Sequence, residues 1–124
     1  MAKECICQQA DIVILPCCGG SNLGQLANAA AVRMTHEGKG RMFCLAGIGG
    51  HVSSMIASCM GADSVLVIDG CDVACAKKTV EHAGISVSKH VVITELGIRR
   101  NKNFNIDNNE IQRVIDACMG GVMR

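Results

Sequence analysis

The stretch VLVIDGCDVACAKK, residues 65–78, begins as an uninterrupted apolar run and then breaks at an Asp-Gly pair. An apolar run of this length, without polar alternation, is typical of a strand whose two faces are both covered. Asp-Gly favours a turn, and the residues that follow predict a helix over 72–83, capped by Asp72. The stretch therefore predicts one strand–turn–helix unit of a parallel sheet, with two cysteines, Cys71 and Cys75, at the turn.

The same unit recurs along the chain. Apolar runs predict strands over residues 11–15, 41–46, 64–69 and 90–96. Helical patterns follow them over residues 22–38, 51–60, 72–83 and 110–120. Strands that alternate with helices are typical of parallel sheets with right-handed crossovers. We predict an α/β fold, a three-layer Rossmann-like domain with a four-stranded parallel sheet in the order 2-1-3-4.

The length of the chain suits one such domain. We expect residues 11–124 to form it, preceded by a segment, residues 1–10, that carries Cys5 and Cys7 as a C-x-C pair. A chain of 124 residues can bury a sizeable core without disulfides. Since only two residues are aromatic, that core must consist of aliphatic side chains, Met and Cys.

The composition excludes several classes of partner. The net charge is +1 at pH 7, and the chain has no Trp and no Tyr, so it offers neither a basic field nor a base-stacking surface for nucleic acid. The apolar runs are far shorter than the roughly 20 residues that span a bilayer, and we expect no membrane association. The start of the chain, MAKECICQQ, lacks the apolar core of a secretory signal, and we expect a cytoplasmic protein.

The nine cysteines are the strongest chemical signal in the sequence. Their number is odd, and cytoplasmic thiols are kept reduced, so clustered cysteines there are more often metal ligands or catalytic groups than disulfide partners. Ligands of parallel sheets bind beyond the carboxyl ends of the strands. Cys71 and Cys75 follow such an end, and their C-x3-C spacing lies within the range of zinc-ligand pairs. The sequence therefore predicts a zinc site at this edge of the sheet.

Zinc takes four ligands, so two more must come from other strand ends. Cys17 directly follows the first predicted strand. Cys44 lies inside the second, which leaves open whether its side chain faces the site or a covering helix. Cys18 and His51 are reserve ligands.

Two carboxylates, Asp69 and Glu95, lie at further strand ends, where they could orient a metal ligand or accept a proton. The predicted helix starts at Ser21–Asn22 and His51–Ser53 could also hold a small anionic ligand. For the remaining thiols, basic residues and histidines we expect core, surface or helix-end positions. These residues are Cys59, Cys118, Arg99, Arg100, Lys102, His36, His82 and His90.

Several motifs, taken together, resemble a known family. They are DGC (69–71), AC (74–75), CLAGIGG (44–50), CGGSNLGQLANAAA (18–31) and TELGI (94–98). In this order and spacing they are similar to the DGC-domain family, which is named after its Asp-Gly-Cys motif. The resemblance extends over residues 11–124. It implies zinc binding on a domain whose biochemical role is not established.

The resemblance also implies which cysteines hold the metal. The cysteines of the family pattern carry over to Cys17, Cys44, Cys71 and Cys75. Two positions differ from that pattern: Cys18 stands where serine is more usual, and Asp72 where proline is common. Neither difference removes an expected ligand.

Three functions fit these residues. The first is a zinc-binding protein that senses or handles metal or thiols through a closed set of thiolates. The second is a metal-dependent enzyme with an open zinc position, in which Glu95 or Asp69 moves protons. The third is redox or sulfur-transfer chemistry at Cys17 or Cys71, although the sequence has no C-x-x-C motif. An iron–sulfur cluster on the same thiolates is an alternative cofactor.

Overall fold

The computed structural model describes residues 10–120, so Cys5 and Cys7 lie outside the described residues. It contains a four-stranded sheet in which every neighbouring pair is parallel. The strand order is β3-β2-β4-β5, which confirms the predicted α/β fold and its 2-1-3-4 order. The strands are β2 (Ile12–Pro16), β3 (Arg41–Met42), β4 (Ser64–Asp69) and β5 (Lys89–Val92).

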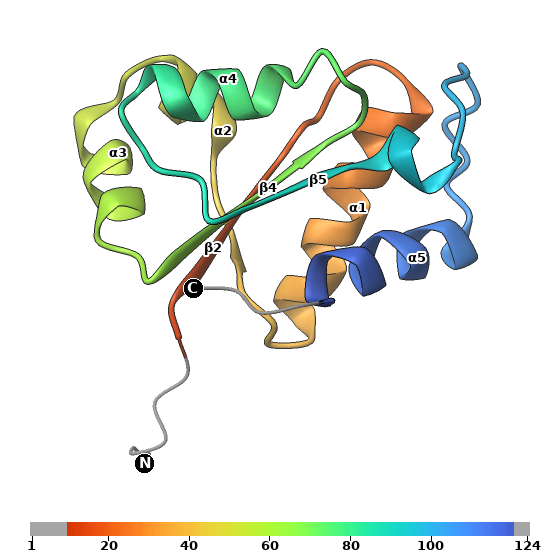
Figure 1. Ribbon diagram of the computed structural model, residues 1–124, viewed down its shortest axis with the longest axis horizontal. Coiled ribbons are helices and arrows are strands. Elements are labelled where there is room, and N and C mark those ends of the chain that lie inside the picture. The colour runs from red at the N-terminus through yellow and green to blue at the C-terminus, as the bar shows by residue number, and fades with distance from the viewer. Residues whose placement is uncertain (1–9, 121–124) are drawn as a thin grey trace.

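Helices cover both faces of this sheet and complete three layers (Figure 1). One face carries α1 (Asn22–His36) and α5 (Asn108–Met119). The other carries α2 (Leu45–Gly49), α3 (Ser53–Met60) and α4 (Cys75–His82). A short 3-10 helix, η1 (Ile93–Leu96), follows β5.

The two central strands alternate their side chains between two cores. On β2, Ile14 packs under α1 and α5, whereas Val13 and Leu15 pack under the opposite helices. Leu66 and Val67 divide in the same way on β4, all of whose residues are buried. Because successive side chains of a strand point to opposite faces, a continuous apolar run fills both cores at once.

The second predicted strand, residues 41–46, was too long. Only Arg41–Met42 pairs with β2, and the chain then turns into the helix α2 from Leu45. The helical turn buries Ile48 completely in the core beneath α4, a position that a straight strand would not reach. The fourth strand was also too long, since the chain leaves β5 after Val92 and curls into η1, where Ile93 enters the opposite core.

The predicted start of the third helix was wrong as well. Asp72 does not cap it; α4 begins at Cys75 after Ala74, which has a φ of 56° and provides no side-chain cap. Residues with a side chain rarely adopt this left-handed conformation. The cap comes from farther back in the chain, as described below for Asp69.

Two glycines allow α1 to approach the loops at the carboxyl edge of the sheet. A Cβ atom on Gly24 would lie 2.4 Å from the backbone of Gly19, and one on Gly70 would lie 2.7 Å from Cβ of Leu23. Real Cβ atoms do not approach other atoms so closely, so both positions require glycine. The start of α1 is therefore packed directly against the turns that follow β2 and β4.

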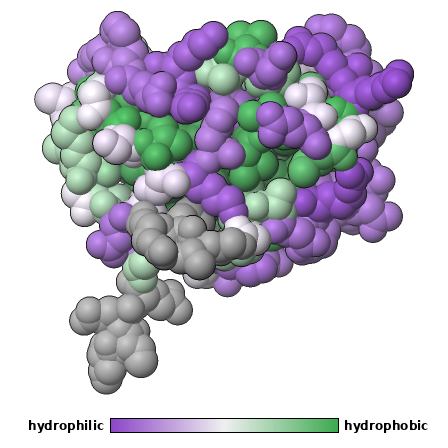
Figure 2. All heavy atoms as spheres, in the orientation of Figure 1, coloured by the Kyte–Doolittle hydropathy of each residue, from purple (hydrophilic) through white to green (hydrophobic). Residues whose placement is uncertain are grey.

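The surface over α4 is mostly polar, and apolar side chains emerge in the band beneath it, where the sheet lies (Figure 2). Within residues 10–120 no helix has both the length and the apolar character needed to cross a membrane.

Gly24→Ala tests the close packing of α1. Alanine favours helix over glycine by about 1 kcal/mol, but here the added methyl group must displace the Gly19 backbone. We expect a net decrease of about 1–3 kcal/mol in the free energy of unfolding, measured with urea and circular dichroism. Gly20→Ala is the matched control, because nothing lies within 4 Å of its new Cβ. An unchanged or higher stability of Gly24→Ala would contradict this packing.

Candidate metal centre

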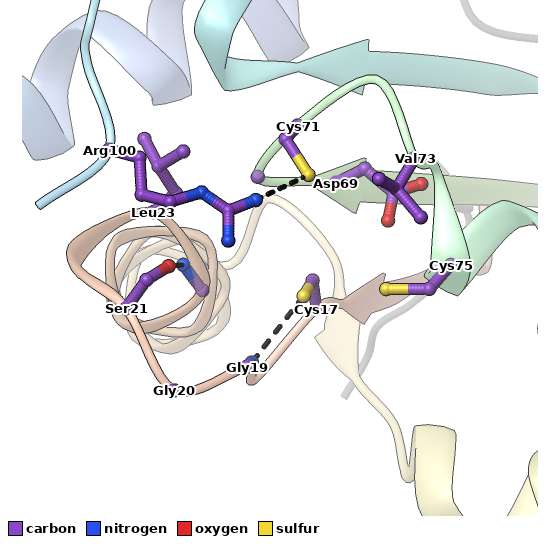
Figure 3. A pocket seen from close by; sticks show the side chains of 12 residues that line it. Cys17, Gly19, Gly20, Ser21, Leu23, Asp69, Cys71, Val73, Cys75 and Arg100 are labelled. Carbon is purple, nitrogen blue, oxygen red and sulfur yellow. Dashed lines mark hydrogen bonds between the residues drawn. The ribbon is translucent and has the colours of Figure 1, made fainter.

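The candidate site lies between the carboxyl ends of β2 and β4, the two central strands. The chain leaves β2 towards α1 on one face and leaves β4 towards α4 on the other. Such a divergence opens a crevice at the sheet edge, where ligands of parallel α/β folds bind. The pocket there has a volume of about 260 Å³. Its lining includes three thiols, a carboxylate and a guanidinium, from Cys17, Cys71, Cys75, Asp69 and Arg100 (Figure 3).

Three of these residues form a cluster that could hold a metal ion. One ligand atom each of Cys17, Asp69 and Cys75 lies within 4.8 Å of the other two. Cys17 reaches this place because its N–H donates to Ile68 O at 2.8 Å, which continues the ladder between β2 and β4 by one residue. Its Sγ in turn accepts the Gly19 N–H at 3.4 Å, so the backbone orients the sulfur.

Asp69 holds the start of α4 in position. Its carboxylate is 1% exposed and accepts the N–H groups of Ala76 at 2.8 Å and Lys77 at 3.1 Å. Nε2 of His90, on the neighbouring strand β5, lies 2.7 Å from the same carboxylate. The Asp69 side chain therefore replaces the missing helix cap and places Cys75, the first residue of α4, beside Cys17.

The Cys75 thiol is in an environment that disfavours its negative charge. Burial raises the pKa of Cys75, and so do the neighbouring Cys17 and Asp69. Acidic side chains this close together disfavour one another's charged forms, whereas a cation between them would favour those forms. The cluster therefore has the electrostatic character of a cation site.

Cys71 lies in the same pocket, but its sulfur is bonded elsewhere. Nη2 of Arg100 donates to Cys71 Sγ at 2.9 Å, and the sulfur is not part of the three-residue cluster (Figure 3). Arg100 was expected on a solvated surface. It is exposed, yet its guanidinium closes one side of the pocket and brings a positive charge to it.

Asn22 explains why Arg100 reaches the pocket. Its buried amide donates to Arg99 O at 2.8 Å and accepts the Asn101 N–H at 2.6 Å. These bonds tie the segment after η1 to the first turn of α1. The sequence did not indicate these roles of Asn22, Arg100 and His90, because each acts through a partner at least 21 positions away along the chain.

The other predicted site residues lie apart from the cluster. Cys44 precedes α2 as its N-cap and is exposed, and Cys18 is exposed next to Cys17. Glu95 is exposed on η1. His51 contacts the ring of His82 at the far end of α4. Of the described residues, these four are absent from the lining of the 260 Å³ pocket.

Cys59 and Cys118 are buried in the two cores, as expected. Burial raises the pKa of both thiols, that of Cys118 to about 12. At pH 8 we therefore expect iodoacetamide to label the exposed Cys18 in the native protein but neither core thiol, as mapped by peptide mass spectrometry. Both core thiols should react once urea unfolds the chain. Rapid labelling of Cys118 in the native protein would contradict its assignment to the core.

Asp69→Asn tests the cap of α4. The amide keeps the size of the carboxylate but presents an NH₂ group where an oxygen now accepts a hydrogen bond. We expect the free energy of unfolding to decrease by about 1–3 kcal/mol and the amides of Ala76 and Lys77 to exchange faster with deuterium. Asp72→Asn is the control, since that side chain is exposed and should shift stability by less than about 0.5 kcal/mol. Equal effects of the two variants would refute the capping role of Asp69.

Comparison with known proteins identifies the family of the chain. The family model described as the DGC domain matches residues 13–118. The chain is also similar to the anaerobic and virulence modulator AnvM of Pseudomonas aeruginosa, with 26% identity over 102 residues that cover 82% of this chain and 78% of that protein. No solved structure matches. The match over residues 13–118 includes every cysteine of the pocket, and the chain belongs to the DGC domain family.

Proposed function

We propose that this protein binds one zinc ion through cysteine thiolates at the carboxyl edge of its sheet and serves in sensing or handling metal or thiols. The observation that carries the proposal is the cluster of Cys17, Cys75 and Asp69, whose ligand atoms lie within 4.8 Å of one another. Membership of the DGC domain family supports it.

The cluster fits the dimensions of a zinc site. Zn–S bonds of about 2.3 Å in a tetrahedron put two ligand sulfurs about 3.8 Å apart. Small side-chain rotations of Cys17 and Cys75 would bring their sulfurs to that separation. The electrostatic attraction of three acidic groups is also stronger for a divalent cation than for a monovalent one.

Cys71 is the third ligand in this proposal. It lines the same pocket, and a rotation of its side chain would exchange the Arg100 contact for the metal. The Arg100 guanidinium could remain near the rotated Cys71 sulfur and offset part of the negative charge of the thiolates. Bound zinc would supply the remaining positive charge and, with an open coordination position, a Lewis acid.

Cys44 is the proposed fourth ligand. Its Cα lies two positions beyond Met42, which pairs with Ile14 on β2, and the Phe43 N–H still donates to Ile14 O. If the chain continued β3 in this register, Cys44 would lie level with Pro16, one residue before Cys17, on a strand about 4.8 Å away. In this proposal a movement at the start of α2 brings Cys44 towards that position and completes a four-thiolate set.

Asp69 has a supporting role in this proposal. Its oxygens already accept three hydrogen bonds, two of them from α4, and a metal bond would have to compete with them. The carboxylate instead orients Cys75, as residues that support metal ligands through hydrogen bonds commonly do. A site closed by four thiolates suits sensing better than catalysis. The name of the similar Pseudomonas aeruginosa protein, a modulator, is in keeping with a regulatory role.

Thiol chemistry without metal is the second candidate. The Arg100–Cys71 contact favours it, because reactive cysteines commonly lie beside a cationic side chain in a partly exposed place. In this case Cys71 alone would react rapidly with an electrophile, and chelators would not change its rate.

Elemental analysis separates these candidates. We expect about one zinc per chain purified without added metal, and no absorption of the kind that iron–sulfur clusters give. Cys17→Ser and Cys75→Ser should each weaken zinc binding by more than about 100-fold. Even the substitution of a residue that only hydrogen-bonds to a metal ligand typically lowers the metal affinity about 10- to 100-fold. Cys118→Ala is the control and should retain the metal, because that thiol is buried in the core.

Cys44→Ser distinguishes a closed site from an open one. A large loss of zinc, with four thiols protected from labelling, supports four-thiolate binding. Retention of zinc, with three protected thiols, supports an open position. Full zinc retention by both Cys17→Ser and Cys75→Ser would overturn the proposed site.

A further inference from the structure

We infer that His51 and His82 form a second metal site, separate from the thiolate cluster, for a divalent transition-metal ion such as Ni²⁺, Cu²⁺ or Zn²⁺. Their ring centroids lie 5.2 Å apart with an interplanar angle of 81°. Both residues are exposed and line a depression of about 310 Å³. The other residues of its lining are Gly49, Lys78 and Thr79.

The backbone, rather than chance contact between mobile side chains, brings the two residues together. His51 has a φ of 57°, in the left-handed region that costs a residue with a side chain roughly 1 kcal/mol or more. Its N–H donates to Ile48 O at 3.0 Å, and Ile48 is completely buried. At Gly49 an added Cβ would lie 3.4 Å from Thr79, so α2 packs closely on α4 beside the pair. The strained turn thus directs His51 towards the last residue of α4, His82.

The ring nitrogens of this pair are available. Within residues 10–120 neither ring hydrogen-bonds to another residue, whereas the His90 ring is occupied by Asp69. Imidazole is a preferred ligand of Zn²⁺, Cu²⁺ and Ni²⁺. The rings now meet edge to face, and rotation about their exposed Cβ–Cγ bonds would aim one nitrogen of each at a common ion. Water would fill the remaining coordination positions.

The positive charge of Lys78 affects which ions this site can bind. Lys78 also lines the depression, and its positive charge opposes the binding of a cation there. Lys78 is exposed, so its chain can extend into solvent when an ion binds. Removal of this charge should therefore strengthen metal binding, whereas it would weaken the binding of an anion. The sign of that effect distinguishes the two classes of ligand.

The site is independent of the thiolate cluster. His82 ends the helix that Cys75 begins, and a helix of this length separates its ends by about 10 Å. A single ion cannot bridge that distance. The inference therefore stands whether or not zinc binds to the cysteines.

Proton NMR of the imidazole signals, with Ni²⁺ as the probe, tests the inference, since the chain has only four histidines. In protein first loaded with one equivalent of zinc, so that the thiolates are occupied, substoichiometric Ni²⁺ should broaden the signals of His51 and His82 before those of His36 and His90. His51→Ala and His82→Ala should each weaken Ni²⁺ binding by about tenfold or more, because they remove the chelate. His36→Ala, at another exposed position, should leave the affinity unchanged.

Two further variants complete the test. Lys78→Gln should tighten Ni²⁺ binding, and Cys75→Ser should preserve the broadening of the His51 and His82 signals. Equal broadening of all exposed histidines, an unchanged affinity in His82→Ala, or loss of the broadening in Cys75→Ser would overturn the inference. Circular dichroism of each variant verifies that the exposed substitutions leave the fold intact.

Discussion

The candidate metal centre depends on the buried carboxylate of Asp69. A buried charge is tolerated only when hydrogen bonds compensate for the water it has lost, and three groups do so here: two N–H groups of α4 and the ring of His90. These bonds join β4, β5 and α4 at one point. Because Ala74 offers the helix no cap of its own, the position of Cys75 follows from that of Asp69.

The same residue type has two different fates in this fold. Cys59 and Cys118 are enclosed by aliphatic side chains, where burial keeps them protonated and inert. Cys17, Cys71 and Cys75 line a pocket between the ends of β2 and β4, and the Gly19 N–H and the Arg100 guanidinium donate to two of their sulfurs. A core with few aromatic residues can use Cys as a small apolar side chain, so the number of thiols alone does not indicate how many bind a ligand.

The two ends of helix α4 carry chemically different side chains. Its first residue contributes a thiol to the pocket at the sheet edge, and its last contributes an imidazole to the pair with His51. The helix α2 lies alongside, with Cys44 as its N-cap and His51 just beyond its end. Thiols and imidazoles thus lie at opposite ends of one pair of packed helices.

The sequence by itself determined the fold class and the strand ends that carry Cys17 and Cys71, because continuous apolar runs and the turns after them are local features. The predicted 2-1-3-4 order is correct, but the pairing of the strands is decided by the packed sheet. It did not determine where β3, β5 and α4 stop or start, since those limits depend on what each residue packs against. Only the tertiary structure decided that Asp69 caps α4, that Arg100 reaches Cys71 and that His51 meets His82. Each of these contacts joins residues that no local pattern links, and each exists only once the sheet and its helices are packed.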